Sequence, residues 1–199
     1  MSDTEGKSGF VHIHAVLEAS RTIAANILGD EVSLPRCLEL ARVVHAILTS
    51  PNQLVRPMVE ALISGAGEAA AHERTHDWLD NATRVAWNIA GNVGKSVLGQ
   101  DISFEDRVTL AEAVVSIGFS THAHTSKINA FFRQDPKNQE KARVYEELDD
   151  ALRLALKQTS EHLGPESPLL AFYAKEILSI SFAPHAPAEM RAMFLRQSQ

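Results

Sequence analysis

The sequence has one cysteine, no hydrophobic run as long as a membrane span and no excess of positive charge. Cys37 has no second cysteine with which to form an intramolecular disulfide, so nothing points to an oxidising compartment. The longest apolar stretches fall far short of the roughly 20 residues that cross a bilayer; they are 43–48, 169–173 and 177–182. Nineteen Lys and Arg against 25 Asp and Glu give a net charge of −6, which argues against a general nucleic-acid coat.

What is present is the composition of a globular protein. The 199 residues are 45% hydrophobic and 22% charged, which is too apolar for a chain that stays disordered. No low-complexity linker divides the chain, so we expect residues 1–199 to form a single domain. Residues 1–9 are polar and lead into no signal-peptide hydrophobic region, so we expect a flexible tail and a cytoplasmic location.

Helix start and stop signals punctuate the chain. The segment 50–53 (Ser-Pro-Asn-Gln) has the form of a capping box, Ser103 is a second N-cap, and Gly29, Gly118 and Gly164 follow apolar-periodic runs. No segment alternates with period two between hairpin signals. These patterns predict an all-α, single-domain multi-helix bundle of about eight helices. The expected segments are 10–28, 34–48, 51–64 (bent or interrupted at Pro57), 68–90, 104–117, 121–133, 136–163 and 168–182, with a short one at 187–197.

The sharpest motif is His72-Glu-Arg-Thr-His76, which has the form His-Glu-x-x-His. On a helix, two histidines four residues apart can bind one zinc ion. His72, His76 and the adjacent Asp77 are therefore the candidate metal ligands. The apolar stripe of the same helix, however, places His72 at its edge and turns His76 toward solvent. We therefore expect an exposed polar helix face without a cofactor, and a divalent metal ion is the alternative.

The pair His76-Asp77, taken with His45 and with Asp149 or Asp150, resembles the ligand pattern of the helical HD-type metal phosphohydrolases. The resemblance implies a divalent cation that activates water against a phosphate ester. The sequence departs from the family at Thr75, where those enzymes have an apolar residue. This metal-dependent hydrolase is the alternative function.

The string Gly91-Asn-Val-Gly-Lys-Ser96 has the form of the end of a phosphate loop. A complete loop needs a glycine at position 89 and a preceding strand, whereas the chain has Ile89 at the end of an amphipathic helix. We expect these glycines to unwind the end of a helix rather than to bind a nucleotide.

Two charged segments follow one another in the C-terminal half. Between Lys127 and Arg143 there are five basic and two acidic residues, with Phe131 and Phe132 nearby. This stretch could bind RNA or another polyanion, although nucleic acid is not favoured. The acidic run 146–150 that follows is expected to be a solvated helix face, with a site for a cation or a basic partner as the alternative.

No pattern combines a nucleophile, a base and an orienting group at a convincing spacing. We therefore expect a non-catalytic helical protein that works through protein contacts, either with itself or with a partner. The segments 168–182 and 187–197 are apolar, and the second carries Met190, Met193, Phe194 and Leu195. An apolar terminal helix is a common docking element, so we expect a homo-oligomer mediated partly by these C-terminal helices.

Overall fold

The structure is a computed structural model that describes residues 4–64, 69–132 and 139–196, with side chains described at 14–62, 72–131, 139–189, 191–192 and 196. These residues form nine α-helices and no strand, which confirms the all-α prediction. The helices are α1 (Thr4–Leu28), α2 (Leu34–Leu48), α3 (Arg56–Ser64), α4 (Ala69–Leu98), α5 (Phe104–Gly118), α6 (Thr125–Phe132), α7 (Gln139–Leu163), α8 (Leu170–Ser181) and α9 (Ala188–Arg196).

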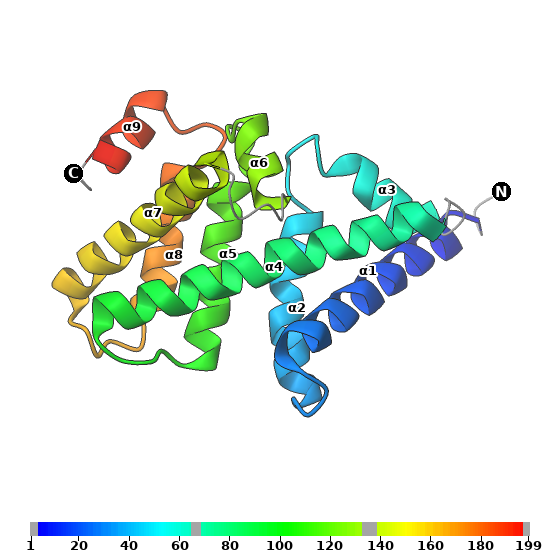
Figure 1. The fold of residues 1–199 in the computed structure, drawn as a ribbon, viewed down its shortest axis with the longest axis horizontal. Coiled ribbons are helices and arrows are strands. Elements are labelled where there is room, and N and C mark those ends of the chain that lie inside the picture. Colours follow the sequence, from blue (N-terminus) through cyan, green and yellow to red (C-terminus); the bar gives the residue numbers. More distant parts are fainter. Residues whose placement is uncertain (1–3, 65–68, 133–138, 197–199) are drawn as a thin grey trace.

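The 30-residue helix α4 runs along the length of the molecule (Figure 1). Helices α1, α2 and α3 pack around its N-terminal half, and α6 and α7 pack beside it farther along the chain. Helix α5 lies at the centre and contacts α2, α4, α7 and α8. Helix α8 packs against α5 and α7, and the C-terminal α9 contacts α7 and α8.

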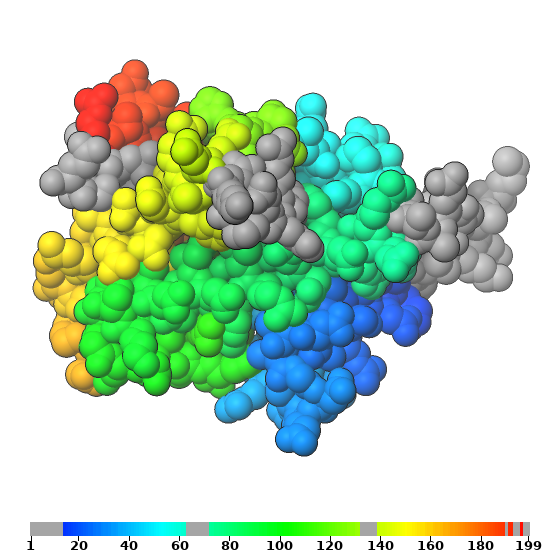
Figure 2. All heavy atoms as spheres, viewed as in Figure 1, coloured from blue at the N-terminus to red at the C-terminus, as the bar shows by residue number. Residues whose placement is uncertain are grey.

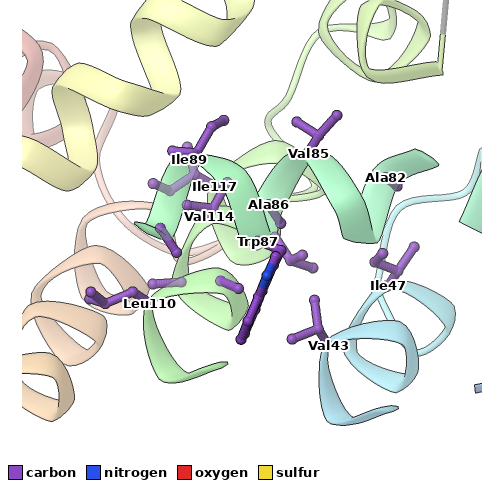
Figure 3. Packing of buried hydrophobic residues seen from close by; sticks show 14 of the residues in the cluster. Val43, Ile47, Ala82, Val85, Ala86, Trp87, Ile89, Leu110, Val114 and Ile117 are labelled. Atoms are coloured by element: carbon purple, nitrogen blue, oxygen red, sulfur yellow. The ribbon is translucent and has the colours of Figure 1, made fainter. Parts of the chain in front are cut away.

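The core forms where α2, α4 and α5 meet (Figure 3). Val43 and Ile47 of α2 and Ala86 of α4 are fully buried there, and Ile117 of α5 is fully buried in the same cluster. Trp87 extends this cluster toward the start of α5, where its ring meets Phe104 at a centroid distance of 5.2 Å. Because α5 carries apolar residues on every side, it can be surrounded by other helices.

All three glycines expected to end helices lie at helix ends, and two of them have the left-handed conformation. Gly29 and Gly164 follow α1 and α7 with φ of 91° and 85°, a conformation that glycine adopts without strain. Gly118 is the last residue of α5 and has no left-handed φ; an added Cβ there would be 2.8 Å from Cε2 of Phe131. The expected cap at Ser103 is confirmed, since its hydroxyl accepts a hydrogen bond from the Asp106 amide at 3.0 Å.

Helix α4 does not unwind near residue 90, contrary to the sequence-based expectation. It continues through Gly91 and Gly94 to Leu98. A Cβ at Gly91 would lie 2.6 Å from Cζ of Arg107, and one at Gly94 would lie 2.8 Å from Cδ1 of Ile102. The glycines therefore allow α5 and the preceding loop to approach α4 closely. The phosphate-loop string is regular helix in this structure.

The capping box predicted at residues 50–53 does not start a helix, and α3 begins only at Arg56. The Ser50 hydroxyl donates to the Phe119 carbonyl at 2.6 Å, and the side-chain amide of Asn52 donates to the Ser120 carbonyl at 3.2 Å. The side-chain oxygen of Asn52 accepts from the Leu54 amide at 3.0 Å. These bonds hold 50–54 as a turn against the loop that follows α5, so tertiary contacts override the local signal.

The first helix starts earlier than expected, at Thr4 instead of residue 10, so residues 4–9 of the expected tail are helical. Within the described parts of the chain, no helix has both the length and the apolar character needed to cross a bilayer.

Candidate functional site

The predicted metal ligands lie near the start of α4. The rings of His72 and His76 are one helical turn apart, with centroids separated by 4.6 Å. His72 and Asp77 are exposed, and His76 is half-buried, so the expectation that His76 faces solvent and His72 lies nearer the apolar stripe is wrong. Burial and the neighbouring His72 lower the pKa of His76, although Asp77 acts in the opposite direction. The lowered pKa favours the neutral form of His76, which is the form in which histidine binds metals.

The structure does not bring the remaining predicted ligands to this pair. His45 is exposed on α2, and Asp149 and Asp150 lie on α7. The carboxylate of Asp149 accepts a hydrogen bond from Arg153 at 2.8 Å. No group of three His, Cys, Asp or Glu side chains able to hold a metal ion occurs within the described residues. Metal-assisted hydrolysis needs several ligands around one open position, so this geometry supplies no observation in favour of the HD-type alternative.

The described part of the basic stretch from Lys127 to Arg143 does not form a continuous cationic surface. Lys127 is only 7% exposed and forms an ion pair with Glu147, with 2.5 Å between Nζ and Oε1. Lys141 lies over the ring of Tyr145, with Nζ 5.6 Å from its centroid. Arg133 and Lys137 lie outside the described residues. At least one of the five cations is therefore used inside the fold, where it cannot meet a phosphate.

Glu112 is a buried charge that the sequence analysis did not single out. It lies on α5 with 7% of its surface exposed. Its carboxylate forms ion pairs with Arg42 of α2, 3.1 Å from Nε, and with Lys175 of α8. A buried charge is tolerated when it is paired in this way. The network links three helices and fixes the orientation of α8 on α5.

The outward side of α8, together with its N-cap residue Leu169, carries four large apolar side chains, which we call the α8 stripe: Leu169, Phe172, Tyr173 and Ile180. Their exposed fractions are 51%, 54%, 46% and 61%. Residues at this spacing share one side of a helix, and Glu176 is the charged residue among them. The opposite side packs on the core through the buried residues Leu170, Ala171, Ala174, Leu178 and Ser181.

The apolar character of segment 168–182 is evident from its residues, whereas the side that stays uncovered is not. The answer depends on the packing of α5 and α7 against one side of α8. The side chains of Met190, Met193, Phe194 and Leu195 in the terminal helix lie outside the described side chains. The α8 stripe is therefore the exposed apolar surface that the described C-terminal residues provide for a protein contact.

Comparison with protein-family models, with curated proteins and with solved structures finds no match to this chain.

Proposed function

We propose that this protein works through protein contacts and that the α8 stripe pairs with the same surface of a second copy. The observation that carries the proposal is the exposure of Leu169, Phe172, Tyr173 and Ile180 along one side of a single helix. Large apolar side chains gathered in one patch are a common mark of an interaction site, whereas single exposed ones are ordinary.

The order of residues in the stripe favours a second copy as the partner. Leu169 and Ile180 lie at its two ends, and the aromatic residues lie between them. In an antiparallel pair with a two-fold axis midway along the stripe, Leu169 faces Ile180 of the second copy. The same axis would bring Tyr173 opposite Glu176, so that the phenol can donate a hydrogen bond to the carboxylate that lies beside the stripe.

The size of the patch suits a dimer of modest affinity. With about half of each side chain exposed, the stripe offers roughly 400 Å² of apolar surface, within the range of the largest patches on monomers. A standard interface covers about 800 Å² on each partner. The stripe would therefore form the apolar centre of the interface, and polar residues around it would form the rim.

The test is the molar mass in solution, measured by light scattering across micromolar concentrations. The unchanged chain should approach twice its 21.8 kDa mass as concentration rises. Ile180→Glu and Phe172→Glu should each give a monomer, because they place a charge in the apolar centre. The matched control is Leu38→Glu on α2, which changes an equally exposed leucine (48%) away from the stripe and should leave the dimer intact.

Circular dichroism of each variant should match that of the unchanged chain, since all three positions are exposed. A monomer at every concentration would refute self-pairing. A dimer that survives both α8 substitutions, or that Leu38→Glu disrupts equally, would place the interface elsewhere.

A further inference from the structure

A groove separate from the α8 stripe runs between α4 and α7. It has a volume of about 670 Å³ and is lined by Val85, Asn88, Ile89, Asn92, Tyr145, Glu146, Asp149 and Asp150. Both helices reach the surface side by side on the face shown in Figure 2. In Figure 3, Val85 and Ile89 point from α4 toward the side on which α7 passes. Pockets of this volume are large enough for specific binding.

The base of the groove is apolar and its two sides are polar. Val85 and Ile89 are 8% and 7% exposed and Tyr145 is half-buried, so these residues form the base. Asn88 and Asn92, one turn apart, are exposed on the α4 side. Glu146 and Asp150, also one turn apart, are exposed on the α7 side. Burial raises the pKa of Tyr145, so its phenol remains a neutral hydrogen-bonding group near neutral pH.

Among the described residues, the charges around the groove leave two carboxylates without a counter-charge. Asp149 is paired with Arg153, which also donates to the Ser96 hydroxyl at 2.5 Å at the end of the groove. Lys141 lies at the other end, over the ring of Tyr145. Neither Glu146 nor Asp150 takes part in an ion pair within the described part of the chain. The side formed by α7 is therefore negative over one helical turn.

We infer that the α4–α7 groove binds a basic amphipathic helix of a partner protein. Apolar residues on one side of that helix would lie over Val85, Ile89 and Tyr145, and Lys or Arg residues beside them would meet Glu146 and Asp150. The side-chain amides of Asn88 and Asn92 can form hydrogen bonds with polar groups on the side of the partner helix that faces α4. The proposal is independent of self-pairing through α8, because it uses other residues on other helices.

A helix suits the groove better than a small polycation does. The four polar side chains along the two sides are exposed, so a small ligand would remain largely in water and would gain little from charges that solvent screens. A helix adds apolar contact along the base of the groove, and burial of that surface does not weaken with salt. Both the charges and the apolar base are then needed for binding.

The test uses the full chain and a fluorescent synthetic helix of leucine and lysine as the probe. The helix has leucines along one side, and the comparison peptide has the same composition in scrambled order. Fluorescence anisotropy should show binding of the amphipathic peptide and at least about tenfold weaker binding of the scrambled one. The double variant Glu146→Gln with Asp150→Asn should weaken binding of the amphipathic peptide about tenfold.

The matched control is the double variant Asp30→Asn with Glu31→Gln. It makes the same change in net charge at two exposed carboxylates between α1 and α2, and it should bind the peptide like the unchanged chain. A third variant, Asn92→Arg, places a cation on the exposed α4 side and should also weaken binding. Because all five positions are exposed, unchanged circular dichroism will separate loss of binding from loss of the fold.

Three results would overturn the inference. One is equal binding by the unchanged chain and the variant with Glu146→Gln and Asp150→Asn. Another is equal weakening by the control at Asp30 and Glu31, which would mean that overall charge alone attracts the peptide. The third is displacement of the peptide by spermine at concentrations as low as those of unlabelled peptide, which would identify a general polycation site.

Discussion

Helices α5 and α8 are both rich in apolar residues, yet their surroundings in the fold differ. Helix α5 is enclosed, with Leu110, Ala113 and Val115 buried on different sides and even its Glu112 almost fully covered. Helix α8 has neighbours on one side, and its other side leaves Phe172 and Ile180 more than half exposed. An apolar helix can thus be the centre of a fold or can carry a surface for another molecule. The neighbours decide between these outcomes.

The largest expected difference between the two helices comes from the same substitution in each. Ile117→Ala removes a fully buried side chain of α5 and should lower the free energy of unfolding by about 2–5 kcal/mol. Ile180→Ala removes a side chain that is 61% exposed and should change it by less than about 0.5 kcal/mol. Urea denaturation at low protein concentration measures both. Equal losses would show that α8 is covered in solution.

A second prediction concerns the close packing around α5. Gly118→Ala would bring a Cβ within 2.8 Å of the Phe131 ring, which is itself 1% exposed and has little space to move. We expect the free energy of unfolding to fall by about 1–3 kcal/mol, even though alanine favours helix more than glycine does. Thermal denaturation followed by circular dichroism tests this expectation. A stabilised variant would show that the ring moves freely.

The third prediction concerns the ion pair that connects α5 and α8. Glu112→Gln removes the carboxylate that pairs with Lys175 of α8 and Arg42 of α2. Because both cations are partly exposed and recover some hydration, the expected loss is about 1–2 kcal/mol, less than for a fully buried pair. High salt should reduce the difference between the variant and the unchanged chain. A difference that does not respond to salt would point to packing as its cause.

The smallest expected effect lies away from both helices, at the histidine pair of α4. The pKa of His76 is lowered from its ordinary value of 6.5, so the unfolded chain binds this proton more tightly than the folded chain does. The contribution of His76 to the free energy of unfolding is therefore fully present above pH 6.5. It is lost as the pH falls through the lowered pKa of the folded chain. His76→Asn should remove this part of the pH dependence, measured as melting temperature at pH 8 and pH 5.

At neutral pH the double variant His72→Ala with His76→Ala should change the free energy of unfolding by less than about 1 kcal/mol, because His72 is exposed and His76 is only half-buried. Stoichiometric zinc in the unchanged chain, absent from this double variant, would restore the metal alternative.

Much of the fold followed from local patterns. Helix α2 has the predicted bounds, and Ser103 caps α5 through its own side chain. Gly29 and Gly164 end helices because a left-handed residue is needed there and glycine adopts that conformation most easily. Such signals depend on neighbours within a few residues, so the sequence contains them in full.

Other features depended on residues far along the chain. Gly91 resembles a helix end, but α4 continues through it, and the absent side chain leaves room for Arg107 of α5. Ser50 resembles an N-cap, but its hydroxyl bonds to the Phe119 carbonyl, 69 positions away. A local pattern cannot show which distant group will pack against a glycine or accept a hydrogen bond from a serine hydroxyl.

The two candidate surfaces, the α8 stripe and the α4–α7 groove, also depend partly on local sequence and partly on tertiary packing. By itself the sequence determined that the chain is helical, that segment 168–182 is apolar and that 146–150 is acidic. Tertiary structure alone decided that Ile180 stays exposed while Ile117 is enclosed, and that Glu146 borders a groove with an apolar base. Helix formation is governed by contacts within a turn or two, whereas exposure is governed by which other helices pack alongside.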